Sequence, residues 1–283
     1  MTLTGVGPAA LAVALGGAGA AVGLFAGGRN KAGAWMLALV SAALSVALVV
    51  LAVGLLGNDG SLVYVADHSS RATSWPYRLA GIWGGMSGSL LLWTWMAAGW
   101  AVVTGGAVRR RVPDLAGTFS AVVAAEVAVL AGLLVFSSRP FDRLAVPAID
   151  GGGLNPVLLH PAMLYHPPLL YAGAVGLVVP FALAIAGLVS PADDGRWLAL
   201  AASAAQVSLV PLGAGMLAGA HWAYVELGWG GYWAWDPVEN GGLLPWLAAV
   251  AFLHAAVAAR RRPRRAGAPV AAAGLAGLAF CLG

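Results

Sequence analysis

The sequence has 283 residues, of which 60% are hydrophobic and only 9% are charged, and its mean hydropathy is +0.85. A soluble globular domain does not need so much apolar surface, so the composition indicates a polytopic membrane protein. The single cysteine, Cys281, excludes a disulfide framework and a Cys-x-x-Cys-His attachment site, so the chain is not itself a c-type cytochrome. The net charge of +4 does not indicate a nucleic-acid partner, because the basic residues lie in loops between apolar runs.

Eight apolar runs are each long enough to cross a bilayer, which takes about 20 residues. We expect spans near residues 8–27, 33–56, 83–106, 115–137, 167–189, 197–219, 243–259 and 266–283. The first run has no basic segment before it, which favours a retained span over a cleaved signal. The predicted fold is therefore an all-α bundle of about eight transmembrane helices, forming a single domain over residues 1–283.

Basic residues alternate in density from one loop to the next. Eleven of the 15 lie in one set of short loops, and the other set holds Arg71, Arg78, Arg139 and Arg143. The positive-inside rule places the first set in the cytoplasm and the N-terminus outside. The long connections, 57–82 and 138–166, and a Trp-rich loop, 220–242, then face the outer side of a cytoplasmic membrane.

The Trp-rich loop has four large aromatic rings within seven residues, at Trp229, Tyr232, Trp233 and Trp235. Trp and Tyr suit a membrane boundary, but a boundary belt needs only one or two of them at each helix end. Together with neighbouring glycines, which let the backbone approach closely, this density predicts a platform for a flat apolar ligand.

The acidic residues after these rings predict the start of a helix. Asp236 suits the N-cap, Pro237 the first helical position and Glu239 the third, which is the pattern of a capping box. The aromatic loop is therefore expected to lead directly into a helix.

The five histidines fall into three groups. For His68 and His221 we favour a role as hydrogen-bonded boundary residues over a role as ligands. His160 and His166 lie in proline-rich segments on the predicted outer face, and Pro167 can place His166 at a helix cap. A haem iron takes such a neutral imidazole. His254 is predicted roughly 16 Å into the seventh span, where an ionisable residue is functional by default; the alternative is a hydrogen bond to a neighbouring helix.

Several segments, in chain order, together resemble the CcmF-type cytochrome c haem lyases, which belong to a wider haem-handling family with a Trp-rich "WWD" loop. The similar segments are the W-G-G-x-x-G-S-L-L-L-W stretch at 83–93, the R-P-F-D-R-L loop at 139–144, the N-P and H-P-P segments at 155–156 and 166–168, and the W-G-G-Y-W-A-W-D-P-V-E-N string at 229–240. The last of these is the most specific.

The resemblance implies a haem held on the outer face, with His166, or alternatively His160, as an axial ligand. The implied haem contacts are Trp229, Tyr232, Trp233, Trp235, Asp236, Pro237, Glu239, Asn240 and Trp83. His254 would be one ligand of a second, b-type haem in the membrane. The implied partners are a haem chaperone, apocytochrome c with its thiol-presenting partner, and other membrane subunits of cytochrome c maturation. On charge alone, the four outer arginines are candidates for pairing with the haem propionates.

The sequence also departs from the family pattern. Met86 and Ser87 replace a frequent Gln-Glu pair, Gly241 and Gly242 replace a frequent Ala-Ser pair, and no histidine follows His254. We therefore expect the N-terminal portion of a lyase, incomplete as an enzyme without a C-terminal half. The alternatives are a haem transfer subunit of the CcmC or CcsA type without ligation activity, and a structural membrane subunit that binds no haem.

Overall fold

The computed structural model describes residues 3–189, 196–226, 228 and 230–261, and over these residues the chain is built from helices without a β-strand. This confirms the all-α class expected from the sequence. The long helices are α1 (Leu3–Ala26), α2 (Asn30–Gly57), α5 (Met86–Arg111), α6 (Ala116–Leu133), α7 (His166–Gly176), α8 (Val178–Val189), α9 (Arg196–Glu226) and α10 (Pro237–Arg261). The short ones are α3 (Val63–His68), α4 (Trp75–Ala80), η1 (Gly81–Trp83), η2 (Pro113–Leu115), η3 (Leu134–Ser138), η4 (Pro156–Leu158) and η5 (Pro161–Leu164).

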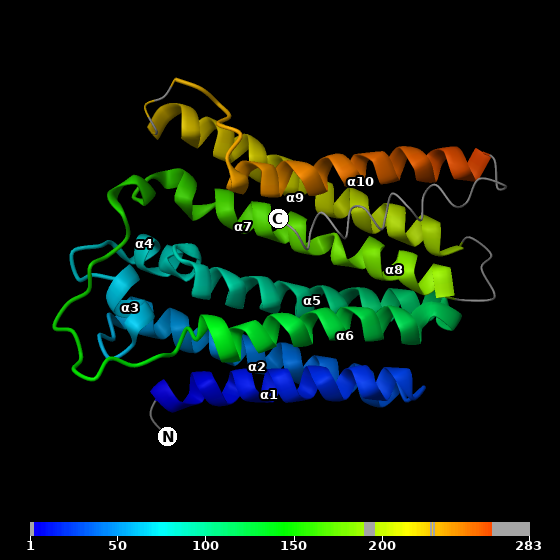
Figure 1. The fold of residues 1–283 in the computed structure, drawn as a ribbon, viewed down its shortest axis with the longest axis horizontal. Coiled ribbons are helices and arrows are strands. Elements are labelled where there is room, and N and C mark those ends of the chain that lie inside the picture. The colour runs from blue at the N-terminus through cyan, green and yellow to red at the C-terminus, as the bar shows by residue number, and fades with distance from the viewer. Residues whose placement is uncertain (1–2, 190–195, 227, 229, 262–283) are drawn as a thin grey trace.

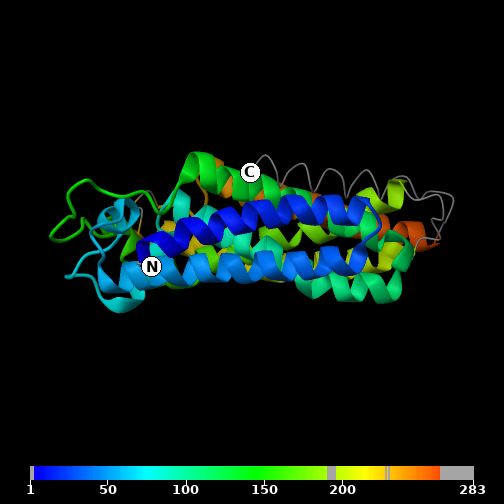
Figure 2. The ribbon, with the colours of Figure 1, turned by 90° about the horizontal axis from the view of Figure 1, so that it is seen from below.

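The long helices lie side by side along the long axis of the molecule, with α1 and α2 at one edge and α9 and α10 at the other (Figure 1). Helix α1 packs on α2 and α6, α7 packs on α9, and α9 packs on α10. Ala14 and Ala18 of α1 are fully buried, as expected for membrane helices that approach closely through small residues. The long loops, α3 and α4 project from one end, which we call the loop-rich end (Figure 2).

Within the described residues, seven helical segments are long and apolar enough to cross a membrane, which identifies a multi-span membrane protein. They correspond in order to the first seven predicted spans. The eighth predicted span, 266–283, lies outside the described residues.

The predicted fifth span, 167–189, is not one uninterrupted helix. It is divided into α7 and α8 at Leu177, whose N–H donates to the Ala174 carbonyl three residues back at 3.1 Å. Pro180 explains the break, because it has no N–H to donate to the residue four positions before it and its ring crowds the carbonyl there.

The predicted external loop 220–242 is too long. Helix α9 continues to Glu226, and α10 already begins at Pro237 instead of at 243. No glycine or proline occurs between residues 220 and 227, so nothing in the sequence interrupts α9 where the apolar run weakens. The segment between these two helices is therefore shorter than predicted, and His221 and Trp222 belong to α9.

Side chains at the loop-rich end tie the two long loops together. Asp150 accepts hydrogen bonds from the Arg71 N–H at 3.0 Å, from Asn58 Nδ2 at 2.8 Å and from the Gly151 N–H at 2.8 Å. These bonds, chiefly the one from the Arg71 N–H, hold the pKa of the Asp150 carboxyl below its usual value. Arg78 donates to the carbonyls of residues 56, 71 and 73. This arginine therefore holds loop 57–82 in shape, although its charge alone made it a candidate for pairing with a haem propionate.

Candidate functional site

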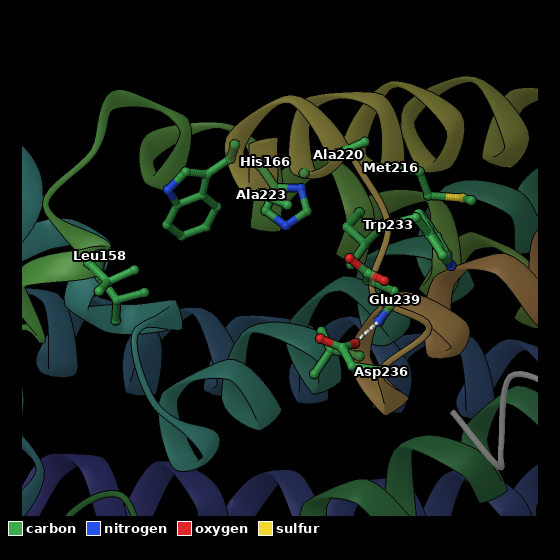
Figure 3. Close-up of a pocket in the computed structure, with 13 residues that line it drawn as sticks. Leu158, His166, Met216, Ala220, Ala223, Trp233, Asp236 and Glu239 are labelled. Atoms are coloured by element: carbon green, nitrogen blue, oxygen red, sulfur yellow. Dashed lines mark hydrogen bonds between the residues drawn. The ribbon is translucent and has the colours of Figure 1, made fainter. Parts of the chain in front are cut away.

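A cavity of about 220 Å³ lies at the loop-rich end, between the start of α7, the last turns of α9 and the start of α10 (Figure 3). Its lining is mostly apolar and includes Leu158, His166, Met216, Trp222 and Trp233. Helices α7 and α9 form one wall, and the end of the aromatic loop forms the other. The fold thus brings the H-P-P segment and the W-A-W-D segment together, although about 70 residues separate them in the chain.

The half-buried imidazole of His166 points into this cavity (Figure 3). Its Nδ1 lies 2.7 Å from the Gly215 carbonyl oxygen. A carbonyl only accepts hydrogen bonds, so Nδ1 carries the proton and the lone pair of Nε2 is free. The ring also meets Trp222 edge to face, with centroids 5.8 Å apart. His166 therefore presents one oriented nitrogen ligand, which is what a haem iron needs from the protein.

His160 is held in the opposite tautomer. It precedes η5, and its Nδ1 accepts the Ala162 N–H at 3.1 Å. When neutral, His160 therefore carries its proton on Nε2, which then has no lone pair for a metal. Its ring stacks on Trp222 at a centroid distance of 6.1 Å. The hydrogen bonds favour His166 over His160 as the ligand.

The aromatic rings of the loop do not all face the cavity. Trp233 lines it and meets Trp235 edge to face at 6.2 Å, while Trp235 is 70% exposed. Tyr232 is exposed and stacks on Tyr224 of α9 at 4.4 Å. Trp229 lies outside the described residues. One predicted ring is thus at the site, and two lie beside it on the surface.

The polar residues after the rings hold the loop in shape. Asp236 accepts from the Glu239 N–H at 2.7 Å, which confirms it as the N-cap. Glu239 accepts from the N–H groups of Ala234 and Trp235 at 2.6 and 2.8 Å, the two residues before the N-cap, whereas a capping box would use the N–H of Asp236. Asn240 donates to the Trp235 carbonyl at 3.1 Å.

These bonds stabilise an unfavourable backbone conformation at Trp235, whose φ is 62°. Residues other than glycine rarely adopt this left-handed backbone conformation, which costs them about 1 kcal/mol. Asp236 and Glu239 border the cavity, but their carboxylates already accept backbone N–H groups. Such strain persists only where the surroundings impose it, often at a ligand site.

Trp83 lies in a neighbouring cavity of about 630 Å³, between α5, α7 and the start of α10. Its Nε1 donates to the Met163 carbonyl at 2.8 Å, which ties η1 to η5. Pro237 also lines this second cavity, and Leu170 and Val238 border both. The two cavities therefore adjoin at Leu170 and Val238, and Trp83 lines the second cavity but not the one that holds His166.

His254 is far from this site. It lies in α10, roughly 25 Å from Pro237 at 1.5 Å per residue, and so nearer the other end of the bundle than the sequence predicted. Its side chain is exposed and has no hydrogen bond or ring contact within the described residues. The alternative expectation, a hydrogen bond to a neighbouring helix, does not hold there.

Three residues at the site were missed by the sequence analysis, namely Gly215, Gly219 and Trp222. They recur at positions i, i+4 and i+7 of α9, which is one face of a helix. Extending the predicted helix beyond 219 would have revealed this spacing.

Known proteins share this fold and much of this sequence. Residues 83–282 match the family described as "Cytochrome C assembly protein". The chain is 42% identical over 244 residues to the "Probable cytochrome c-type biogenesis protein NrfE" of Escherichia coli K12, covering 84% of this chain and 44% of that protein. It is 39% identical over 211 residues to the "Cytochrome c-type biogenesis protein CcmF" of Pseudomonas aeruginosa, covering 73% of this chain and 32% of that protein.

A solved structure, "Cytochrome c Heme Lyase CcmF", matches with a TM-score of 0.80 and 29% identity, over 99% of this chain and 49% of that one. The chain thus spans less than half the length of these relatives. The family match, the sequence identity and the shared fold lead to one conclusion: the chain belongs to the cytochrome c assembly protein family, among its CcmF- and NrfE-like members.

Proposed function

We propose that this chain serves cytochrome c-type biogenesis by holding a substrate haem at its loop-rich end, with Nε2 of His166 as one axial ligand. The observation that carries the proposal is the hydrogen bond from His166 Nδ1 to the Gly215 carbonyl, which leaves Nε2 free toward an aromatic cavity. Among the described residues no group of three or more metal-ligating side chains occurs, which favours an iron already held in a porphyrin over a bare ion.

The apolar lining supports a flat apolar ligand. Trp222 and Trp233 supply large rings at the cavity, and Trp235 extends the aromatic surface outward. The His166 cavity alone is smaller than the 300–1,000 Å³ usual for ligand sites. The haem would therefore displace the exposed Val238 and reach toward Trp83 in the second cavity, or lift the aromatic loop.

The family and the distribution of charges support the proposed partners and sidedness. The basic loops are cytoplasmic and the aromatic loop faces outward, in the cytoplasmic (inner) membrane. A haem chaperone delivers the haem, and apocytochrome c, held by its thiol-presenting partner, receives it through two cysteine thiols. Other membrane subunits of cytochrome c maturation assemble around this chain. His254 ligates a second, b-type haem together with a group from outside the described residues.

The test is a haem titration of the purified chain, followed by its Soret band, in the wild type and in His166→Ala and His160→Ala. We expect His166→Ala to weaken binding of the outer haem at least about 100-fold. Even mutation of a residue that only hydrogen-bonds to a metal ligand lowers metal affinity 10–100-fold. Free imidazole should restore part of the binding, and His160→Ala should have a small effect. A chain without any Soret band, or a large effect of His160→Ala alone, would overturn the proposal.

A further inference from the structure

The contact between α7 and α9 is formed through glycines. A Cβ added at Gly173 or Gly176 of α7 would collide with Leu212 or Ser208 of α9. A Cβ at Gly215 of α9 would lie 2.6 Å from the backbone nitrogen of Leu170 in α7. The two helix backbones therefore lie closer than side chains at these positions would allow.

His166 occupies the outermost part of this contact. Its ring lies directly over Gly219, where a Cβ would be 2.9 Å from Nδ1, 3.1 Å from Nε2 and closer still to Cε1. Real Cβ atoms essentially never make contacts under 3.0 Å, so a side chain at 219 would force the ring out of this position. The ring fits only because residue 219 has no side chain.

Two neighbours on the same face of α9 fix the remaining freedom of the ring. One turn before Gly219, the Gly215 carbonyl accepts a hydrogen bond from the Nδ1–H group of His166. This bond fixes how the ring is rotated about the bond that joins it to Cβ. Nearly one turn after it, Trp222 meets the ring edge to face. Helix α9 therefore determines which nitrogen of His166 faces the cavity.

We infer that Gly219 is the positioning residue for His166: the absence of a side chain there seats the imidazole against the Gly215 carbonyl and aims Nε2 into the cavity. The consequence for haem rests on the proposed function. The orientation of the ring does not, because it is a property of the protein without ligand.

The first experiment measures the ring without haem. The full chain is labelled with ¹⁵N-histidine, purified in detergent, and its imidazole nitrogens are observed by NMR; His166→Ala assigns the signals. The wild type should show a protonated Nδ1 and an unprotonated Nε2 at His166. Gly219→Ala should replace this pattern with that of a ring exchanging between tautomers. Gly213→Ala is the matched control, because its added methyl on the same helix meets only Trp246 Nε1, at 3.4 Å.

The second experiment is a double-mutant cycle on haem affinity. Gly219→Ala should weaken haem binding roughly tenfold, because the ring would no longer be held in place by a hydrogen bond between uncharged groups. In the His166→Ala background, with no ring to displace, the same substitution should have no effect.

Each outcome decides one question. An unchanged His166 signal in Gly219→Ala, or equal weakening of haem binding in both backgrounds, would overturn the positioning role and indicate general helix packing. A changed signal with haem binding indifferent to His166→Ala would keep the positioning role and overturn the proposed ligand instead.

Discussion

His166 and His254 lie toward opposite ends of the bundle and differ in what surrounds them. His166 is half-buried, donates to the Gly215 carbonyl and contacts Trp222. His254 is exposed on α10 and has no partner within the described residues. His166 is oriented by groups of α9, whereas no described residue orients His254.

The difference shows what this part of the chain can do by itself. Leu247, two turns before His254 on the same face of α10, is also exposed, so the surface on that side of His254 is apolar. An uncovered ionisable side chain in hydrocarbon is costly, and such residues pair with other groups. We therefore expect the His166 site to keep its shape in isolation and the His254 site to depend on polypeptide outside the described residues.

The largest effect should come from removing the aromatic rings of the loop. Changing Trp229, Trp233 and Trp235 together to alanine should lower capture of the haem at His166 at least about 100-fold, because a haem that covers all three rings would lose about 1 kcal/mol or more for each ring removed. Membrane insertion and any haem at His254 should be unchanged. The measurement is haem titration of membranes that contain matched amounts of protein. Lost insertion with retained haem affinity would contradict the role of the rings.

His254 tests the other half of the comparison. A low-spin b haem usually takes two axial ligands, and no histidine follows His254 in this sequence, so this chain alone should bind haem there weakly or in a five-coordinate, high-spin form. Adding a polypeptide that carries the remainder of a longer relative should convert this haem to a low-spin form, followed by its visible spectrum. His254→Ala should prevent the conversion, and His221→Ala, an exposed histidine on α9, is the control. A low-spin haem that ignores His254→Ala would refute the assignment.

Glu239 tests how far the outer site depends on its loop. Glu239→Ala removes the acceptor for two backbone N–H groups and releases the left-handed Trp235, so haem affinity should fall roughly tenfold, for a loss of about 1–2 kcal/mol. Glu226→Ala, an exposed glutamate at the end of α9, should change it little. Isothermal titration with haem compares the two, and equal effects would contradict a specific role for Glu239.

Asp150 should give the smallest effect. The pKa of Asp150 is lowered in the folded protein, so its charged form stabilises the loops at any pH above the ordinary pKa of about 3.9. This stabilisation is lost as the pH falls through the lower pKa of the folded state. Asp150→Asn should therefore speed amide hydrogen exchange in loop 57–82 at pH 7. In the wild type the loop should also loosen when Asp150 is protonated below about pH 4, and the variant should lack this change. Asp67→Asn is an exposed control in the same loop. Identical exchange in both variants would contradict the tie between the loops.

The sequence predicted the helices because long apolar runs have few alternatives in a membrane. It misjudged their ends where hydropathy and helix formation diverge. Helix α9 passes through the polar residues His221 and Glu226 without a glycine or proline to stop it, and Pro180 breaks a run that is apolar throughout.

The candidate site was predictable in its local parts only. Proline spacing pointed to His166, and the acidic pattern pointed to the cap at Asp236, because each is a property of neighbouring residues. The contact between His166 and Gly215 joins residues 49 apart, and the choice between His166 and His160 depends on it. No local pattern contains that information, because it arises from the packing of α7 on α9.

The most direct test is the reduction potential of the outer haem in His166→Met and His160→Met. A methionine ligand in place of histidine raises the potential of haem iron. If His166 supplies the axial nitrogen, His166→Met should raise the potential, while His160→Met should leave it at the wild-type value. A raised potential in His160→Met, with none in His166→Met, would show that the iron is held by the other histidine and would contradict the account.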